Sequence, residues 1–125
     1  MHEDLYGTLR EQVLTNLQNG VDVLIDIDTQ GAATIRNSED PIVRQALADI
    51  FIMPPDVEEL RRRLMKRGTE TAQQIESRLA TAMREMELWR DYRYTIVSGS
   101  IEEDLEKVRN IMSAETFLSR RLTPN

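Results

Sequence analysis

The segment Val21–Ala32 reads "VDVLIDIDTQGA" and is the part of the chain from which we predict a parallel sheet. Its first seven residues are rich in β-branched and apolar side chains, which is typical of a strand covered on both faces. The strand closes on two carboxylates, Asp26 and Asp28. Burying an unpaired charge is costly, so these acids must reach water at the strand end or face a site.

The segments on either side of this strand alternate between helical and strand-like patterns. Strands are expected at "DIFIMPP" (49–55) and "YRYTIV" (92–97). Strands alternating with helices imply right-handed crossovers and a parallel sheet, hence an α/β fold. Ligands of such sheets bind beyond the carboxyl ends of the strands, where the two acids fall. Helices are expected at 8–19, 56–68, 71–90 and 100–122, with a short helix or turn at 31–37 and 41–47.

Composition excludes several classes of function. The chain has no cysteine, so it holds no disulfide, thiolate nucleophile or cysteine-ligated metal. His2 is the only histidine, which argues against a Ser-His-Asp triad or a histidine metal site. The formal charge of −6 argues against a nucleic-acid-coating surface. No membrane-spanning run or signal-peptide pattern is present, and we expect a cytoplasmic protein with no membrane partner.

The basic residues are unusual, because fourteen arginines stand against two lysines. Arginine suits bidentate contacts with phosphates, although high-GC coding produces the same bias. On the helix expected at 56–68, Arg63 and Arg67 border the apolar stripe one turn apart, and Arg78 has the same position on the next helix. Arg63 and Arg67, one turn apart on the same helix, can converge on one anion. Alternatively, they are arginines with buried stems and charged ends in water.

The acids Asp26 and Asp28 also have two interpretations. Two residues apart in a strand, they point to the same face and could hold Mg²⁺ or a ligand. The alternative is a structural role, in which they cap the following turn or pair with arginine. Spacing alone does not separate the two.

Several blocks of the chain, in order, resemble the second part of the guanylate kinases. That family has a tyrosine-glycine-serine/threonine motif, an "LDIDVQGA"-like strand, an "IFILPPS" strand, an "LxxRLxxRG" helix and an "RL…E" helix. The matching blocks span nearly the whole chain, and their joint order makes the resemblance specific. They read "YGT" (6–8), "DVLIDIDTQGA" (22–32), "IFIMPPDVEELRRRLMKRGTET" (50–71) and "RLATAMREMELWRDYRYTIV" (78–97).

The resemblance implies a P-loop nucleoside monophosphate kinase-like fold, with a three-layer parallel sheet that lacks the strand carrying the phosphate loop. It implies one partial domain over 1–125, which phosphorylates GMP to GDP with ATP and Mg²⁺. Its parts would be the end of the GMP-binding segment and a helix (1–20), core strands (21–55), arginine-bearing lid-like helices (56–92), and the last strand with the C-terminal helix (93–125).

The resemblance also assigns roles to residues on the GMP side. Tyr6 matches the tyrosine that binds the GMP phosphate, Thr8 a residue near the guanine, and Asp28 an acid on the guanine side. Asp26 matches a strand-end acid near the metal and phosphates, so Mg²⁺ would be held indirectly.

On the ATP side, Arg63, Arg67 and Arg78 match arginines that close over the triphosphate and the transferring phosphoryl group. Phosphoryl transfer needs positioning and charge neutralisation more than covalent chemistry, so such a set is physically sensible. Ser98 stands where the family has an asparagine near the adenine.

The departures from the family pattern lead to further expectations. No GxxxxGK[S/T] phosphate loop occurs, and the matching region begins mid-domain in the family, so we expect a chain inactive alone. Removing the central strand leaves unpaired edges, so we expect self-association, or dependence on a complementing N-terminal segment. Two other readings are a non-catalytic guanylate kinase-like protein-binding module and a receiver-like regulatory domain. The second lacks the lysine after a late strand that its chemistry needs.

Overall fold

The computed structural model describes residues 2–118, with side chains from residue 10 onward. The chain divides between Leu47 and Ala48 into two compact units. No helix among residues 2–118 is both long and apolar enough to cross a membrane.

The first unit is helical. It contains α1 (His2–Gln18), α2 (Thr29–Arg36) and α3 (Pro41–Ala46). α1 begins six residues before the start predicted from the capping pattern, and it ends before Gly20, whose φ is 75°. Asp40 caps α3 by accepting a hydrogen bond from the Ile42 amide at 2.9 Å, and it accepts another from Arg10 of α1 at 3.2 Å. The bond from Arg10 holds the pKa of the Asp40 carboxyl below its usual value.

The strand predicted at "VDVLIDI" is not formed, so that prediction is wrong. Residues 21–28 have no regular secondary structure and belong to no ladder of the described chain, and Val23, Leu24 and Ile27 are exposed. The reason is that a strand is defined by its neighbour: β-branched composition favours the extended backbone, but its amide and carbonyl groups need a second strand to pair with. No strand of the described residues pairs with this segment, because the two strands found there pair only with each other.

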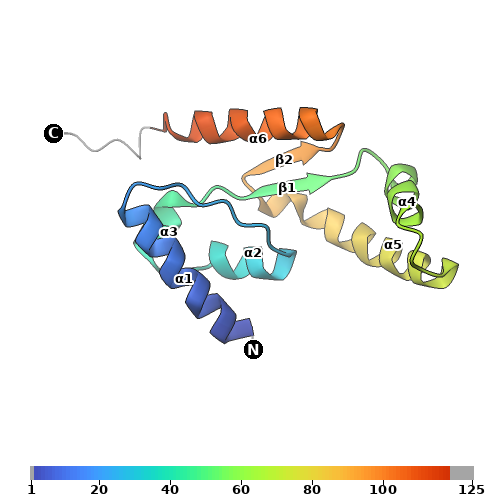
Figure 1. Ribbon diagram of the computed structural model, residues 1–125, viewed down its shortest axis with the longest axis horizontal. Coiled ribbons are helices and arrows are strands. Elements are labelled where there is room, and N and C mark those ends of the chain that lie inside the picture. The colour runs from blue at the N-terminus through green and yellow to red at the C-terminus, as the bar shows by residue number, and fades with distance from the viewer. Residues whose placement is uncertain (1, 119–125) are drawn as a thin grey trace. The chain divides into compact units, whose positions relative to one another are not determined.

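The second unit is α/β. Its strands β1 (Ile50–Met53) and β2 (Tyr94–Val97) pair in parallel, with Ile50 opposite Tyr94 and Met53 opposite Val97. The crossover between them holds α4 (Val57–Lys66), α5 (Ala72–Met86) and the 3₁₀ helix η1 (Glu87–Asp91), and α6 (Ile101–Glu115) follows β2. In Figure 1 the strand pair runs between α6 and α5. This confirms the predicted α/β class, with one parallel pair of strands in the described part of the chain.

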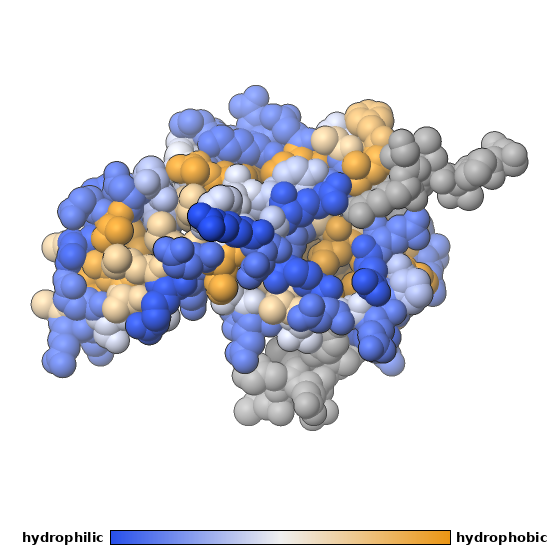
Figure 2. Space-filling model, turned by 180° about the vertical axis from the view of Figure 1, so that it is seen from behind, coloured by the Kyte–Doolittle hydropathy of each residue, from blue (hydrophilic) through white to orange (hydrophobic). Residues whose placement is uncertain are grey.

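The core of this unit is small. Phe51, Leu79 and Ile96 are buried, and the Phe51 ring lies 5.0 Å from that of Tyr92. Ile52, on the other face of β1, is exposed, so β1 is covered on one face only within the described chain. The space-filling view of Figure 2 correspondingly shows hydrophobic surface interspersed with hydrophilic surface.

Local sequence signals account for the helix boundaries of this unit. Asp56 caps α4 by accepting from the Glu59 amide at 2.7 Å, and Gly68, with φ of 68°, follows its end. Thr71 and Ser100 begin α5 and α6 with full capping boxes. Each cap satisfies amides that the first helical turn leaves unpaired, so these boundaries form without tertiary help.

Candidate functional site

Arg63, one of the predicted site residues, forms side-chain hydrogen bonds with two different segments of the chain. It projects from α4, where its Nε donates to Glu59 Oε1 at 3.0 Å, one turn back on the same helix. Its Nη1 donates to Ser98 Oγ, at the end of β2, at 3.2 Å. The side chain remains 39% exposed, so its charge is oriented by two contacts and still reachable from solvent.

Ser98 lies between Arg63 and α6 and is only 9% exposed. Its hydroxyl donates to Asp104 Oδ2 at 2.7 Å, and Asp104 Oδ1 accepts from the Gly99 amide at 2.8 Å. The Gly99 amide, followed by the Ser98 hydroxyl, holds the pKa of the Asp104 carboxyl below its ordinary value. Arg63, Ser98 and Asp104 therefore form one hydrogen-bonded chain across α4, the end of β2 and the first turn of α6.

Glu59 is the acidic partner of two arginines. It accepts from Arg62 Nε at 2.9 Å as well as from Arg63 Nε at 3.0 Å. The hydrogen bond from Arg62, with a further contribution from Arg63, lowers the pKa of the Glu59 carboxyl to about 2. Glu59 is therefore ionised at neutral pH and holds Arg63 through a charge-assisted bond.

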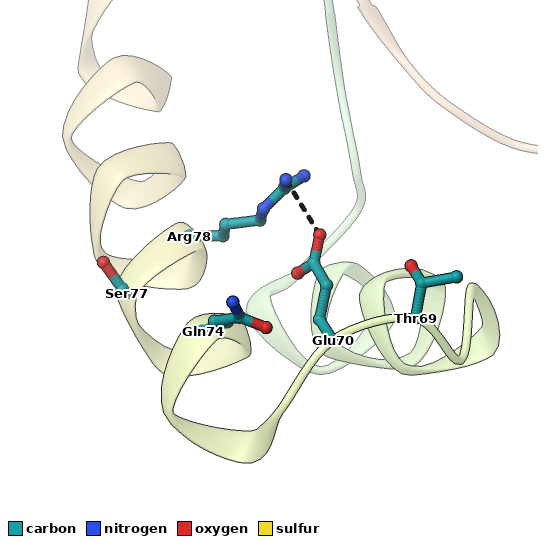
Figure 3. A pocket seen from close by; sticks show the side chains of 5 residues that line it. All are labelled: Thr69, Glu70, Gln74, Ser77 and Arg78. Atoms are coloured by element: carbon teal, nitrogen blue, oxygen red, sulfur yellow. Dashed lines mark ion pairs between the residues drawn. The ribbon is translucent and has the colours of Figure 1, made fainter.

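Arg78 lines a shallow hollow of about 440 Å³ at the start of α5. Figure 3 shows its guanidinium reaching across the hollow to Glu70, with which it forms an ion pair at 2.8 Å. The second Glu70 oxygen is buried and has no hydrogen-bond partner in the described part of the chain. The hollow is lined by Thr69, Glu70, Gln74, Ser77 and Arg78.

The helices that carry these arginines pack on each other. α4 and α5 are in contact, and Arg61 of α4 forms an ion pair with Glu76 of α5. Arg67 lies at the C-cap of α4 and is exposed. The two packed helices thus carry several guanidinium groups, which is suited to a polyanion such as a chain of phosphates.

The two predicted acids of the first unit, Asp26 and Asp28, differ in their surroundings. Asp28 caps α2, its Oδ1 accepting from the Gly31 amide at 2.8 Å, as in the structural alternative that the sequence left open. Asp26 is exposed. Tyr6 and Thr8 lie within α1, and their side chains are outside the described residues.

Three carboxylates in the second unit were missed by reasoning from the sequence: Glu59, Glu70 and Asp104. The spacing of four residues from Glu59 to Arg63 is a helix pairing signal that could have identified the first. The contact from Glu70 to Arg78 spans a loop and two helical turns, and Asp104 reaches Arg63 only through Ser98. No sequence spacing predicts either of these.

Comparisons with known proteins give the family. The sequence model of the family described as guanylate kinase matches residues 1–115. Guanylate kinase of Chelativorans sp. (strain BNC1) is 40% identical over 121 residues, which cover 97% of this chain and 54% of that protein. Guanylate kinase of Caldanaerobacter subterraneus subsp. tengcongensis is 38% identical over 115 residues, covering 92% and 53%.

The solved structures give the same result. The crystal structure of guanylate kinase from Anaplasma phagocytophilum superposes with a TM-score of 0.72 at 35% identity, covering 90% of this chain and 50% of that one. The chain therefore spans about half the length of the relatives it matches.

Proposed function

Since this chain belongs to the guanylate kinase family, we propose that it takes part in the ATP-dependent phosphorylation of GMP to GDP. In this proposal Arg63, Arg67 and Arg78 surround the triphosphate of ATP and the phosphoryl group in transfer. Such a transfer is accelerated chiefly by positioning and by positive charge on the phosphate oxygens, both of which arginine supplies.

The observation that carries the proposal is the pairing of Arg63 and Arg78 with carboxylates on two packed helices. Glu59 holds the first and Glu70 the second, and neither arginine is buried. A phosphate is a stronger and more highly charged acceptor than one carboxylate, so ATP can take over these guanidinium groups without new ones being recruited.

For the GMP side, we propose the roles that the family resemblance implies. Tyr6 would bind the GMP phosphate, and Thr8 and Asp28 would lie on the guanine side. Asp28 would then combine nucleotide recognition with its observed role as the cap of α2. Asp26, which is exposed, would face the metal and phosphates.

Mg²⁺ fits this arrangement only as a partner of the nucleotide. The described residues contain no group of three acidic, histidine or cysteine side chains able to hold a metal ion. Mg²⁺ commonly binds through one or two carboxylates together with substrate phosphates, so Asp26 could contribute one ligand, directly or through water. The ion would supply charge neutralisation on the ATP phosphates.

We further propose that this polypeptide does not turn over by itself. Its sequence has no GxxxxGK[S/T] loop, and the free edges of its strand pair would favour a complementing segment or a second copy. We also propose that the protein is cytoplasmic.

The test is a titration of the chain with a fluorescent ATP analogue and Mg²⁺. We expect saturable binding that Arg63→Ala and Arg78→Ala each weaken by about tenfold, the loss expected for one charge-assisted hydrogen bond. Arg44→Ala, on an exposed position of α3, is the matched control and should leave the affinity unchanged.

ADP production from GMP and MgATP then separates binding from catalysis. We expect none from the chain alone, and activity from a version extended by the phosphate-loop segment of a relative. Turnover by the chain alone would refute the dependence on that loop. Binding indifferent to both arginines would refute their assignment, and would favour a protein-binding role for the module.

A further inference from the structure

We propose that Ser98 positions Arg63 for the ATP phosphates rather than contacting the nucleotide, and that Asp104 orients the Ser98 hydroxyl for this task. The ligand named here rests on the proposed function, whereas the positioning rests on the contacts of the second unit. Neither Ser98 nor Asp104 touches a reacting atom in this scheme, so both are positioning residues.

The Ser98 hydroxyl has a single proton to donate. A guanidinium group has donors and no acceptor, so Ser98 can bind Arg63 only through an oxygen lone pair. The hydroxyl proton must therefore point elsewhere. The Ser98 hydroxyl donates this proton in a hydrogen bond to Asp104 Oδ2, with Oγ and Oδ2 2.7 Å apart. A lone pair of Ser98 Oγ is then left to accept from Arg63 Nη1, 3.2 Å away.

Asp104 is itself held in place. Its other oxygen accepts from the Gly99 amide at 2.8 Å, and it lies in the first turn of α6. The cations that act on it are Lys107 of the same helix and Arg63 of α4. Both Asp104 oxygens therefore accept a hydrogen bond, and an asparagine at this position has only one oxygen with which to accept.

Arg63 is thereby held at two points from two segments of the chain. Glu59 binds its Nε edge from within α4, and Ser98 binds Nη1 from the end of β2. The Arg63 side chain is nevertheless 39% exposed. A cationic group that is already oriented loses less conformational entropy when a phosphate arrives, which strengthens binding.

The same contacts argue against a direct role of Ser98 at the nucleobase. The residue is 9% exposed, its hydroxyl proton is donated to Asp104, and its oxygen accepts from Arg63. A base could reach this hydroxyl only by displacing one of these partners.

The experiment uses the full chain labelled with ¹⁵N and the variants Ser98→Ala and Asp104→Asn. The first readout is the relaxation of the Arg63 Nε–Hε signal, assigned by its disappearance in Arg63→Lys. The second is the dissociation constant for MgATP. We expect both variants to increase the mobility of the Arg63 signal and to weaken MgATP binding about three- to tenfold, as for one lost hydrogen bond.

Ser113→Ala, at an exposed position of α6, is the matched control and should change neither readout. In an Arg63→Lys background, Ser98→Ala should cause little further loss of affinity, because its effect acts through the Arg63 guanidinium.

The outcomes separate this inference from the proposed function. An Arg63 signal that stays rigid in both variants overturns the positioning role. So does a loss of affinity on Ser98→Ala that is as large in the Arg63→Lys background, because it shows direct nucleotide contact. Mobile Arg63 with no MgATP binding by any version supports Ser98 as the positioning residue and overturns ATP as the ligand.

Discussion

Removing Arg93 should destabilise the second unit more than neutralising its partner Glu115, although Glu115 is the more buried of the two. Glu115 closes α6 and is 6% exposed. It accepts from Arg93 Nε at 2.8 Å and from the hydroxyl of Tyr94, the first residue of β2. These bonds tie the end of α6 to the start of β2.

The magnitudes follow from what each substitution leaves behind. Arg93→Ala removes the Arg93 cation from beside the buried Glu115 carboxylate, and breaking a buried pair in this way costs about 3–5 kcal/mol. The Arg93 side chain is 35% exposed, so water screens the pair and we expect the low end, about 3 kcal/mol. Glu115→Gln preserves volume and an acceptor but removes the charge, which should cost about 1 kcal/mol.

The double variant is the sharper test, because the penalty of the first substitution comes from the charge on Glu115. With Glu115→Gln in the Arg93→Ala background, that charge is gone. The free energy of unfolding should therefore be higher in the double variant than in Arg93→Ala alone.

The assay is urea unfolding followed by circular dichroism, with Arg109→Ala, at an exposed position of α6, as the control. We expect the control to lie within about 0.5 kcal/mol of the parent chain. If the double variant is as unstable as the sum of its two single variants, the Glu115 charge is not the source of the penalty and the reasoning fails.

Two further predictions concern pH and a helix cap. The folded-state pKa values of Glu59 and Asp104 lie below their ordinary values. Both carboxylates therefore stabilise the fold at a pH above their ordinary pKa, and this stabilisation is lost as the pH falls through the folded-state pKa. For Glu59 the loss occurs between pH 4.5 and about pH 2. Thermal melts between pH 7 and pH 2 should show it, and a Glu59→Gln/Asp104→Asn chain whose melting temperature falls as steeply over this range would contradict it. Thr71→Ala removes the capping box of α5 and should cost about 1 kcal/mol in urea unfolding, whereas Thr81→Ala, in the middle of that helix, should not destabilise. Equal losses from both threonine variants would mean that the cap is not what is measured.

Much of the second unit was predictable because its signals are local. The caps at Asp56, Thr71 and Ser100 and the left-handed Gly68 involve groups within a few residues of each other. Each of these hydrogen bonds joins residues close in sequence, so its partners do not depend on how distant parts of the chain pack. The alternation of these helices with strands then limits the topology to a parallel crossover, which β1 and β2 confirm.

The candidate site was predictable only in part. The angular position of Arg63 beside the apolar stripe of its helix left two interpretations, an anion-binding arginine or one with a buried stem, and Glu59, four residues earlier, is within reach by helix geometry. The link through Ser98 to Asp104 depends on where β2 ends and α6 begins relative to α4. That relation is a property of the packed unit.

The sequence by itself determined where the helices of the second unit begin and the parallel class of its sheet, because these depend mainly on local propensities, caps and the alternation of helices with strands. The tertiary structure decided which carboxylate holds which arginine, and whether an apolar run becomes a strand. Residues 21–28 have the composition of a buried strand, yet they form no ladder in the described chain. A strand requires a neighbour to satisfy its backbone, and no property of the segment alone supplies one.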